Sequence, residues 1–136
     1  MKAAALLLLL AACNTPTSPG GAGLERVKAG LDGVRPWMYE YWTQAQQELK
    51  AMPIPPLRDP FSVPITRIEF RGEPEWFMCG SVKTAGCFHE HGPLIRYYVG
   101  AQGVIQHEAK HAILWALGDS RWRCIEHPEP CPGTGQ

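Results

Sequence analysis

The pentapeptide HEAKH at residues 107–111 constrains this chain more than any other segment. Two histidines four residues apart on a helix project from nearly the same face, so one metal ion can bind both imidazoles. Glu108 lies beside that face, where it can take a proton from a metal-bound water. The pattern therefore predicts a helix over residues 101–117, with His107 and His111 as metal ligands and Glu108 as a catalytic base. The competing interpretation is a pair of ordinary histidines on an amphipathic helix.

A catalytic zinc site needs a third protein ligand and one open coordination position. His127 is the best candidate, because it follows His111 after a glycine, Gly118, that is expected to end the helix. The distance along the chain allows a turn and a return to the metal. Alternative ligands remain: Glu126, Glu129, His89 and His91.

The N-terminus predicts an exported, lipid-anchored chain. Residues 3–12 are only Ala and Leu after a basic start, a run too short to span a bilayer but typical of a signal peptide. The run ends Leu-Ala-Ala-Cys, which resembles the lipobox of bacterial lipoproteins and implies cleavage before Cys13 and lipidation of that cysteine. Asn14 replaces the Asp that often retains Gram-negative lipoproteins in the inner membrane, which favours the outer membrane or cell surface. An ordinary secretory signal is the alternative.

Behind the signal peptide of residues 1–12, residues 13–23 form a predicted lipidated tether rich in Thr, Pro, Ser and Gly. Residues 24–136 are long enough for one domain with a modest core. The chain has 13 basic and 13 acidic residues, so it lacks the excess of positive charge that is typical of proteins that bind nucleic acid. Membrane attachment is therefore expected from the lipid alone.

The cysteines predict two disulfides. Four of the five cysteines remain after Cys13, and an even number in an exported chain indicates disulfide pairing. The expected pairs are Cys79–Cys87 and Cys124–Cys131, because each brackets a short, turn-rich stretch. A metal site of four cysteines is the alternative.

The apolar patterns predict an α+β domain with N-terminal helices, a small, mostly antiparallel sheet and the HExxH helix. Apolar residues at helical spacing indicate a helix over residues 24–31 and a second one after Pro36. Alternation over Ile65–Arg71 predicts a half-buried strand, and residues 94–99, apolar on both faces, predict a more central strand. Residues 76–78 and 82–88 are expected to form a hairpin clipped by Cys79–Cys87.

The motif, the later histidine and the preceding strands together resemble the minimal zincins, of the SprT-like or minigluzincin type, over about residues 65–130. The resemblance implies His107, His111 and His127 as zinc ligands and Glu108 as the catalytic glutamate. SprT-like proteins are usually intracellular and linked to DNA, whereas this chain is predicted to be exported. The metzincin pattern is absent, because Leu114 and Leu117 stand where its glycine and third histidine would be.

The expected function is that of an envelope-anchored zinc metallopeptidase that hydrolyses peptide bonds in a peptide or protein substrate. Zinc would polarise the scissile carbonyl, and Glu108 would activate the zinc-bound water. Loose candidates for stabilising the oxyanion are Tyr97, Tyr98 and His91. The alternative is a non-catalytic zinc-binding or structural envelope lipoprotein.

Overall fold

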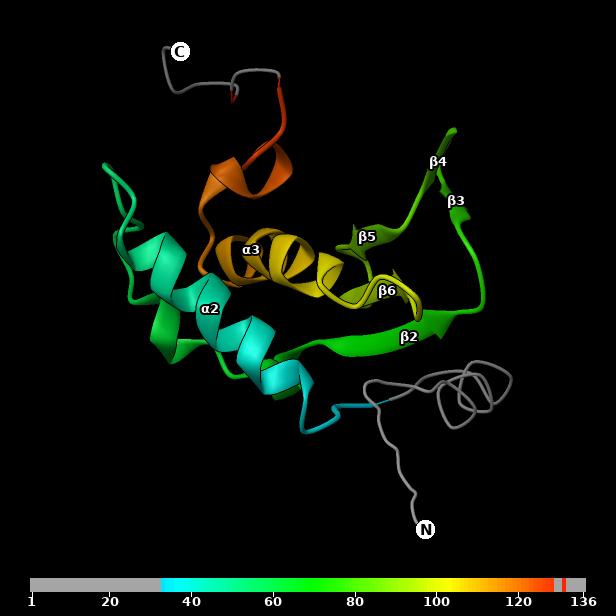
Figure 1. Cartoon of the computed structure of the whole chain (residues 1–136). Helices are drawn as coiled ribbons and strands as arrows, with labels where there is room; N and C mark the ends of the chain where they lie inside the picture. Colours follow the sequence, from blue (N-terminus) through cyan, green and yellow to red (C-terminus); the bar gives the residue numbers. More distant parts are fainter. Residues whose placement is uncertain (1–32, 129–130, 132–136) are drawn as a thin grey trace, which may run out of the picture.

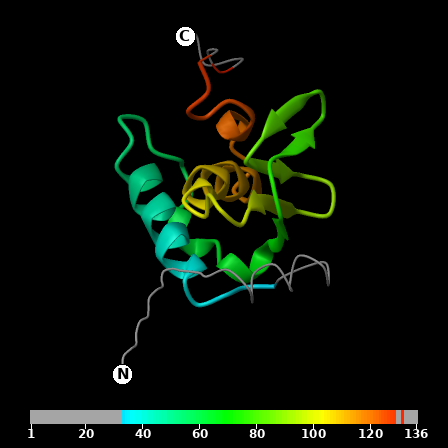
Figure 2. The ribbon, with the colours of Figure 1, turned by 45° about the vertical axis from the view of Figure 1, so that its right-hand side comes forward.

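Helix α3 (Val104–Ala116) lies between helix α2 (Met38–Lys50) and a small sheet, as Figures 1 and 2 show. The computed structural model describes residues 33–128 and residue 131. The predicted signal peptide, the tether with Cys13, the helix over residues 24–31 and Glu129 lie outside the described residues. The part of the chain that is described has the predicted α+β architecture, with the HExxH segment on α3.

Helix α2 packs on α3 through the face that its apolar spacing predicts. Met38, Trp42, Ala45 and Leu49 are all buried on this face. Gln46 is also buried, and its side-chain amide donates to the carbonyl oxygens of Pro60 (3.2 Å) and Val63 (3.1 Å). These bonds attach the proline-rich connection after α2 to the helix, because prolines leave that connection with few backbone donors of its own.

The main sheet has the strand order β2-β6-β5, with β2 at Glu69–Glu73, β6 at Leu94–Tyr98 and β5 at Gly86–His89. Strand β6 is central, as its apolar composition predicts, and it pairs parallel with β2 and antiparallel with β5. Strands β3 (Phe77–Cys79) and β4 (Val82–Thr84) form a separate antiparallel hairpin. Two of these three pairings are antiparallel, as expected.

Two strand boundaries differ from the sequence prediction. The segment Ile65–Arg67 is a 3₁₀ helix, and the strand begins only at Glu69. Pro64 starts this turn, since its carbonyl accepts from Arg67 N at 3.0 Å, and Thr66 is consequently exposed. The predicted strand over residues 82–88 also divides into β4 and β5, because the Thr84 hydroxyl bonds the backbone of Gly86 and turns the chain there.

The core lies where α2, α3 and the sheet meet. The largest side chains with almost no exposure come from all three: Met38, Leu49, Phe70, Ile95, Ile105, Ile113 and Leu114. Within the described residues, no helix is long and apolar enough to cross a membrane. The core packs against one side of α3, and Val104, His107, Glu108 and His111 on the other side line a pocket.

Candidate metal centre

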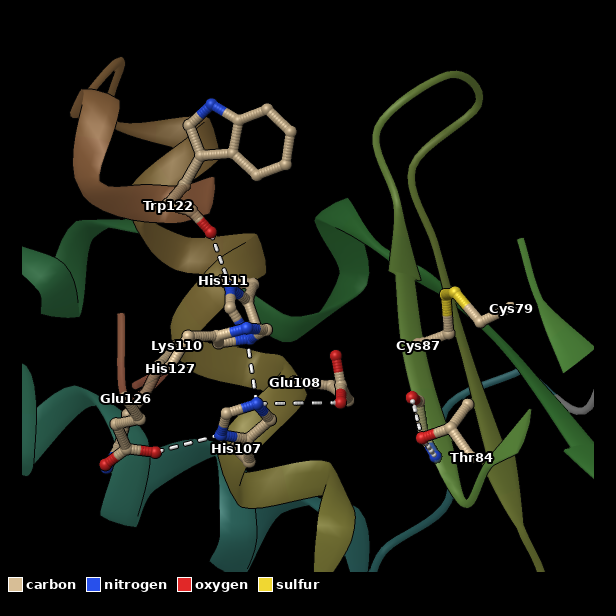
Figure 3. Close-up of polar contacts among 11 residues, drawn as sticks. Cys79, Thr84, Cys87, His107, Glu108, Lys110, His111, Trp122, Glu126 and His127 are labelled. Atoms are coloured by element: carbon tan, nitrogen blue, oxygen red, sulfur yellow. Dashed lines mark hydrogen bonds and ion pairs between the residues drawn. A yellow bond between two sulfur atoms is a disulfide. The ribbon is translucent and has the colours of Figure 1, made fainter. Parts of the chain in front are cut away.

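Three histidines converge at the surface of α3 (Figure 3). His107 and His111 project from neighbouring turns of the helix, and His127 returns from the segment after the 3₁₀ helix η4 (Ser120–Arg123). The Nε2 atom of His111 lies 3.0 Å from Nε2 of His107 and 3.1 Å from Nε2 of His127. The structure thus brings together the three histidines that the sequence analysis selected, and they could hold a metal ion.

The outward nitrogens of two of these rings have acceptors that set their tautomers. His111 Nδ1 lies 2.5 Å from the Trp122 carbonyl oxygen, and His107 Nδ1 lies 3.0 Å from a Glu126 carboxylate oxygen. A carbonyl and a carboxylate only accept, so Nδ1 carries the proton in both rings. Both Nε2 atoms therefore direct a lone pair into the cluster, which is the arrangement a metal ligand needs.

The imidazole of His111 is suited to metal binding because it stays neutral. Burial lowers its pKa to about 4, and the hydrogen bond to the Trp122 carbonyl opposes this only in part. Lone pairs of neutral nitrogens 3.0 Å apart repel one another unless a cation lies between them. The donor set therefore fits a cation, and imidazole nitrogens suit transition-metal ions.

Glu108 occupies the wall beside the three histidines without belonging to the ligand cluster. One of its carboxylate oxygens lies 3.9 Å from His107 Nε2, and the residue is only 6% exposed. Burial raises its pKa to about 7, although the nearby His107 acts in the opposite direction. A carboxyl group with a pKa near neutrality can both accept and return a proton at physiological pH.

The cluster opens into a pocket of about 340 Å³. Strands β4 and β5 form one wall, and η4 with the following segment forms the other. Gly86 lies in the β5 wall, where a Cβ atom would stand 2.6 Å from a Val104 methyl and 3.0 Å from a Glu108 carboxylate oxygen. Only glycine fits here without a shift, a requirement that the sequence alone did not reveal.

A buried lysine supports the site from behind. Lys110 is 5% exposed and forms ion pairs with Glu48 of α2 and with Glu126. Burial would lower the pKa of Lys110, but its hydrogen bonds and charge interactions with the two glutamates raise it above the usual value. Lys110 therefore stays charged and links α2, α3 and the segment that carries His127.

The chain reaches the site after α3 through a defined series of turns. Gly118 adopts φ +75° after the helix, and the Asp119 side chain accepts from Arg121 N at 3.0 Å to cap η4. Glu126 has φ 65°, a conformation that non-glycine residues rarely adopt. This left-handed turn directs the Glu126 carboxylate to the outer side of His107 while His127 reaches the centre.

The described residues that were alternative ligands, Glu126, His89 and His91, lie outside the cluster of three histidines. Glu126 contacts the outer nitrogen of His107, not the cluster centre. His91 is exposed, and His89 lies at the end of β5, where burial and the charges of Arg96 and Arg71 lower its pKa. The suggested oxyanion residues Tyr97, Tyr98 and His91 are not among the described residues that line the pocket, whereas Arg123 is.

Both predicted disulfides, Cys79–Cys87 and Cys124–Cys131, are present. The second one encloses His127 in a short loop.

In comparisons with known proteins, no family model, no curated protein and no solved structure matches this chain.

Proposed function

We propose that the protein is a zinc-dependent metallopeptidase, held at the bacterial cell envelope by a lipid on Cys13. The observation that carries the proposal is the convergence of three Nε2 atoms beside a buried carboxylate in an open pocket. Three imidazoles with one free position are a common ligand set of catalytic zinc, whereas structural zinc sites are closed by four protein ligands.

The spacing of the nitrogens supports zinc. A zinc–nitrogen bond of about 2.0–2.1 Å and tetrahedral angles place two ligand nitrogens about 3.3 Å apart. The Nε2–Nε2 separations of 3.0 and 3.1 Å are close to that value. Only a small outward movement of the rings would be needed to admit the ion.

In the proposed reaction, Glu108 carries the proton. When bound, zinc would lower the pKa of a coordinated water and polarise the scissile carbonyl. The Glu108 carboxylate would take the proton of the attacking water and deliver it to the leaving amine. Its low exposure keeps bulk water from competing for the proton, and its pKa of about 7 matches the task.

The walls of the pocket support a peptide as substrate. Strand β5 is at the edge of the main sheet, and its residues Gly86, Cys87 and Phe88 line the pocket. An extended peptide can add to such an edge by backbone hydrogen bonds. The Arg123 guanidinium, which stacks over the Trp122 ring at 4.6 Å, offers a cation on the opposite wall for the developing oxyanion or a substrate carboxylate.

The test compares two groups of variants in a peptide-library cleavage assay with metal analysis. Glu108→Gln should retain the metal and the fold but lose roughly 10²–10⁴-fold in rate, because an amide cannot accept the proton. His107→Ala, His111→Ala and His127→Ala should lose the metal, because each removes one of three protein ligands. Glu75→Gln and His91→Ala, both at exposed positions, are the matched controls and should behave as the parent.

Two outcomes would contradict the proposal. If His127→Ala bound zinc as tightly as the parent, the ligand set would be wrong. If the parent bound zinc but cleaved no member of a diverse library, the non-catalytic zinc-binding lipoprotein would be the better interpretation.

A further inference from the structure

A second group of metal-ligating side chains lies at strand β5, next to the pocket of the three-histidine centre: Cys79, Cys87 and His89. Cys87 and His89 are two residues apart on β5, so their side chains point to the same face. The alternate residues Gly86 and Phe88 face α3, as the close approach of Gly86 to Glu108 and the ring contact of Phe88 with Trp115 show. The disulfide joins Cys87 to Cys79 at the end of β3.

The potential ligand atoms of Cys79, Cys87 and His89 all lie within 4.8 Å of one another. His89 Nε2 is buried and has no hydrogen-bond partner among the described residues. A buried polar atom without a partner has given up its hydrogen bonds to water without gaining others, so its presence needs an explanation. None of the contacts of the three-histidine centre involves His89, and that centre therefore does not explain it.

We propose that Cys79, Cys87 and His89 form a second, redox-dependent metal site that binds a thiophilic ion such as Zn²⁺ when the disulfide is reduced. Two thiolates and one imidazole are a common partial ligand set for zinc, with a solvent molecule completing the tetrahedron. Arg96, which pairs with Glu73, and Arg71 place positive charge near His89. Two thiolates also offset the repulsion between these arginines and the bound cation.

The chemistry balances in two steps. A dithiol reductant transfers two electrons and two protons to the disulfide, so that the S–S bond of Cys79–Cys87 breaks, two thiols form and the reductant becomes a disulfide. Binding of the ion then releases the two thiol protons to solvent. A disulfide oxidant reverses the cycle: it takes two electrons from the two thiolates and two protons from solvent and becomes a dithiol, while the Cys79–Cys87 bond re-forms and the ion is released.

The site would give the β3–β4 hairpin two alternative attachments to β5, one covalent and one through a metal. Cys79, Thr84 and Cys87 also line the pocket beside the histidine centre. A change from the disulfide to a metal link between Cys79 and Cys87 would therefore change one wall of that pocket. In Figure 1 the hairpin projects from the sheet as a separate arm. The inference does not require that the protein be a peptidase, and it can fail or hold independently of that proposal.

The test titrates the full chain in detergent solution with Co²⁺, whose thiolate charge-transfer absorption separates a sulfur-containing site from one made only of histidines. The reductant is a trialkylphosphine, which takes up the oxygen of water as it converts the disulfide to two thiols. The oxidised chain should bind one equivalent of Co²⁺ without the thiolate band. The reduced chain should bind a second equivalent with the band, and Zn²⁺ should displace it.

Variants assign the second equivalent. The Cys79→Ser/Cys87→Ser double variant should lose the band, and His89→Ala should weaken binding of the second equivalent on the order of tenfold or more, since one of three protein ligands is lost. The two controls, His91→Ala and the Cys13→Ser/Cys124→Ser/Cys131→Ser variant, should keep both the thiolate band and the second equivalent of Co²⁺. Near-ultraviolet circular dichroism checks that each variant is folded, and His89→Ala, which leaves both cysteines in place, decides the question if the serine variant is not.

Three results would overturn the inference. They are a reduced parent without the thiolate band, a His89→Ala variant with the affinity of the parent, and a band that depends on Cys13, Cys124 or Cys131.

Discussion

Glu126, which the sequence predicts only as an alternative ligand, best shows how the candidate metal centre is organised. Its carboxylate accepts from the outer nitrogen of His107 at 3.0 Å and pairs with Lys110. A carboxylate behind a ligating histidine fixes the ring orientation and raises the basicity of the inner nitrogen. Lys110 lowers the pKa of Glu126 against the effect of burial, which keeps the carboxylate ionised.

Glu126→Ala should lower zinc affinity about 10–100-fold while the protein still binds one equivalent, because the histidine ligands remain but His107 loses its orienting partner. Glu126→Gln should lower the zinc affinity by a smaller factor, since the amide oxygen can still accept a hydrogen bond from His107. Equilibrium competition with a chelator of known affinity measures both, with Glu75→Ala as an exposed control. Complete loss of zinc from Glu126→Ala would make Glu126 a ligand; an unchanged affinity would remove its positioning role.

The HExxH motif could be found from sequence because its spacing is set by helix geometry alone. The supporting residues could not, because they depend on chain segments far apart: Glu48 is on α2, Lys110 on α3 and Glu126 after η4. Gly86 likewise acquires its importance only from the approach of β5 to Val104 and Glu108. Long-range packing of this kind has no local sequence signature.

Helices and strands with a strong apolar periodicity could be predicted from the sequence, whereas the short turns that interrupt such patterns could not. The buried face of α2 and the central place of β6 follow from apolar spacing. The 3₁₀ helix at Ile65–Arg67 and the break between β4 and β5 do not, since each depends on one local hydrogen bond that competes with the alternating pattern. The parallel pairing of β2 with β6 also needs tertiary information.

The loop that carries His127 is expected to depend on the Cys124–Cys131 bond. Changing both cysteines to serine should reduce the free energy of unfolding by about 2–3 kcal/mol, from the loop-closure entropy of a chain segment this short. It should also weaken zinc binding, because His127 must then be ordered when the ion binds. Chemical denaturation and zinc competition measure the two effects. An unchanged zinc affinity would show that the Lys110–Glu126 pair alone orders this loop.

The predicted lipid anchor on Cys13 can be tested on the full chain. If Cys13 is lipidated, as the lipobox-like sequence predicts, the parent should partition into the detergent phase and label with a fatty-acid probe. Cys13→Ser should give an unprocessed or soluble form without the label. The Cys124→Ser/Cys131→Ser variant is a cysteine-loss control and should keep the label. Unchanged membrane partition of Cys13→Ser would contradict the lipoprotein assignment.

The metal-free protein should have an unusual dependence of stability on pH, because its site buries two groups with opposite shifts. Burial lowers the pKa of His111 to about 4, below its ordinary value of 6.5, so the folded state binds fewer protons than the unfolded state. The resulting stability is present above pH 6.5 and is lost as the pH falls toward 4. Burial raises the pKa of Glu108 from 4.5 to about 7, so its contribution is present below pH 4.5 and is lost as the pH rises toward 7.

Between about pH 4.5 and 6.5 the two contributions change in opposite directions and should offset each other. Glu108→Gln removes only the carboxyl contribution, so the variant should lose stability, relative to the parent, as the pH falls through this window. The difference should approach about 1.4 kcal/mol per pH unit, the value for one proton. Urea denaturation of parent and variant in the presence of a chelator measures it, and Glu75→Gln controls for a change at an exposed carboxylate. If the curves of Glu108→Gln and the parent ran parallel between pH 4.5 and 6.5, Glu108 would not be protonated in the folded, metal-free site, and its proposed readiness to exchange a proton near neutral pH would lose its support.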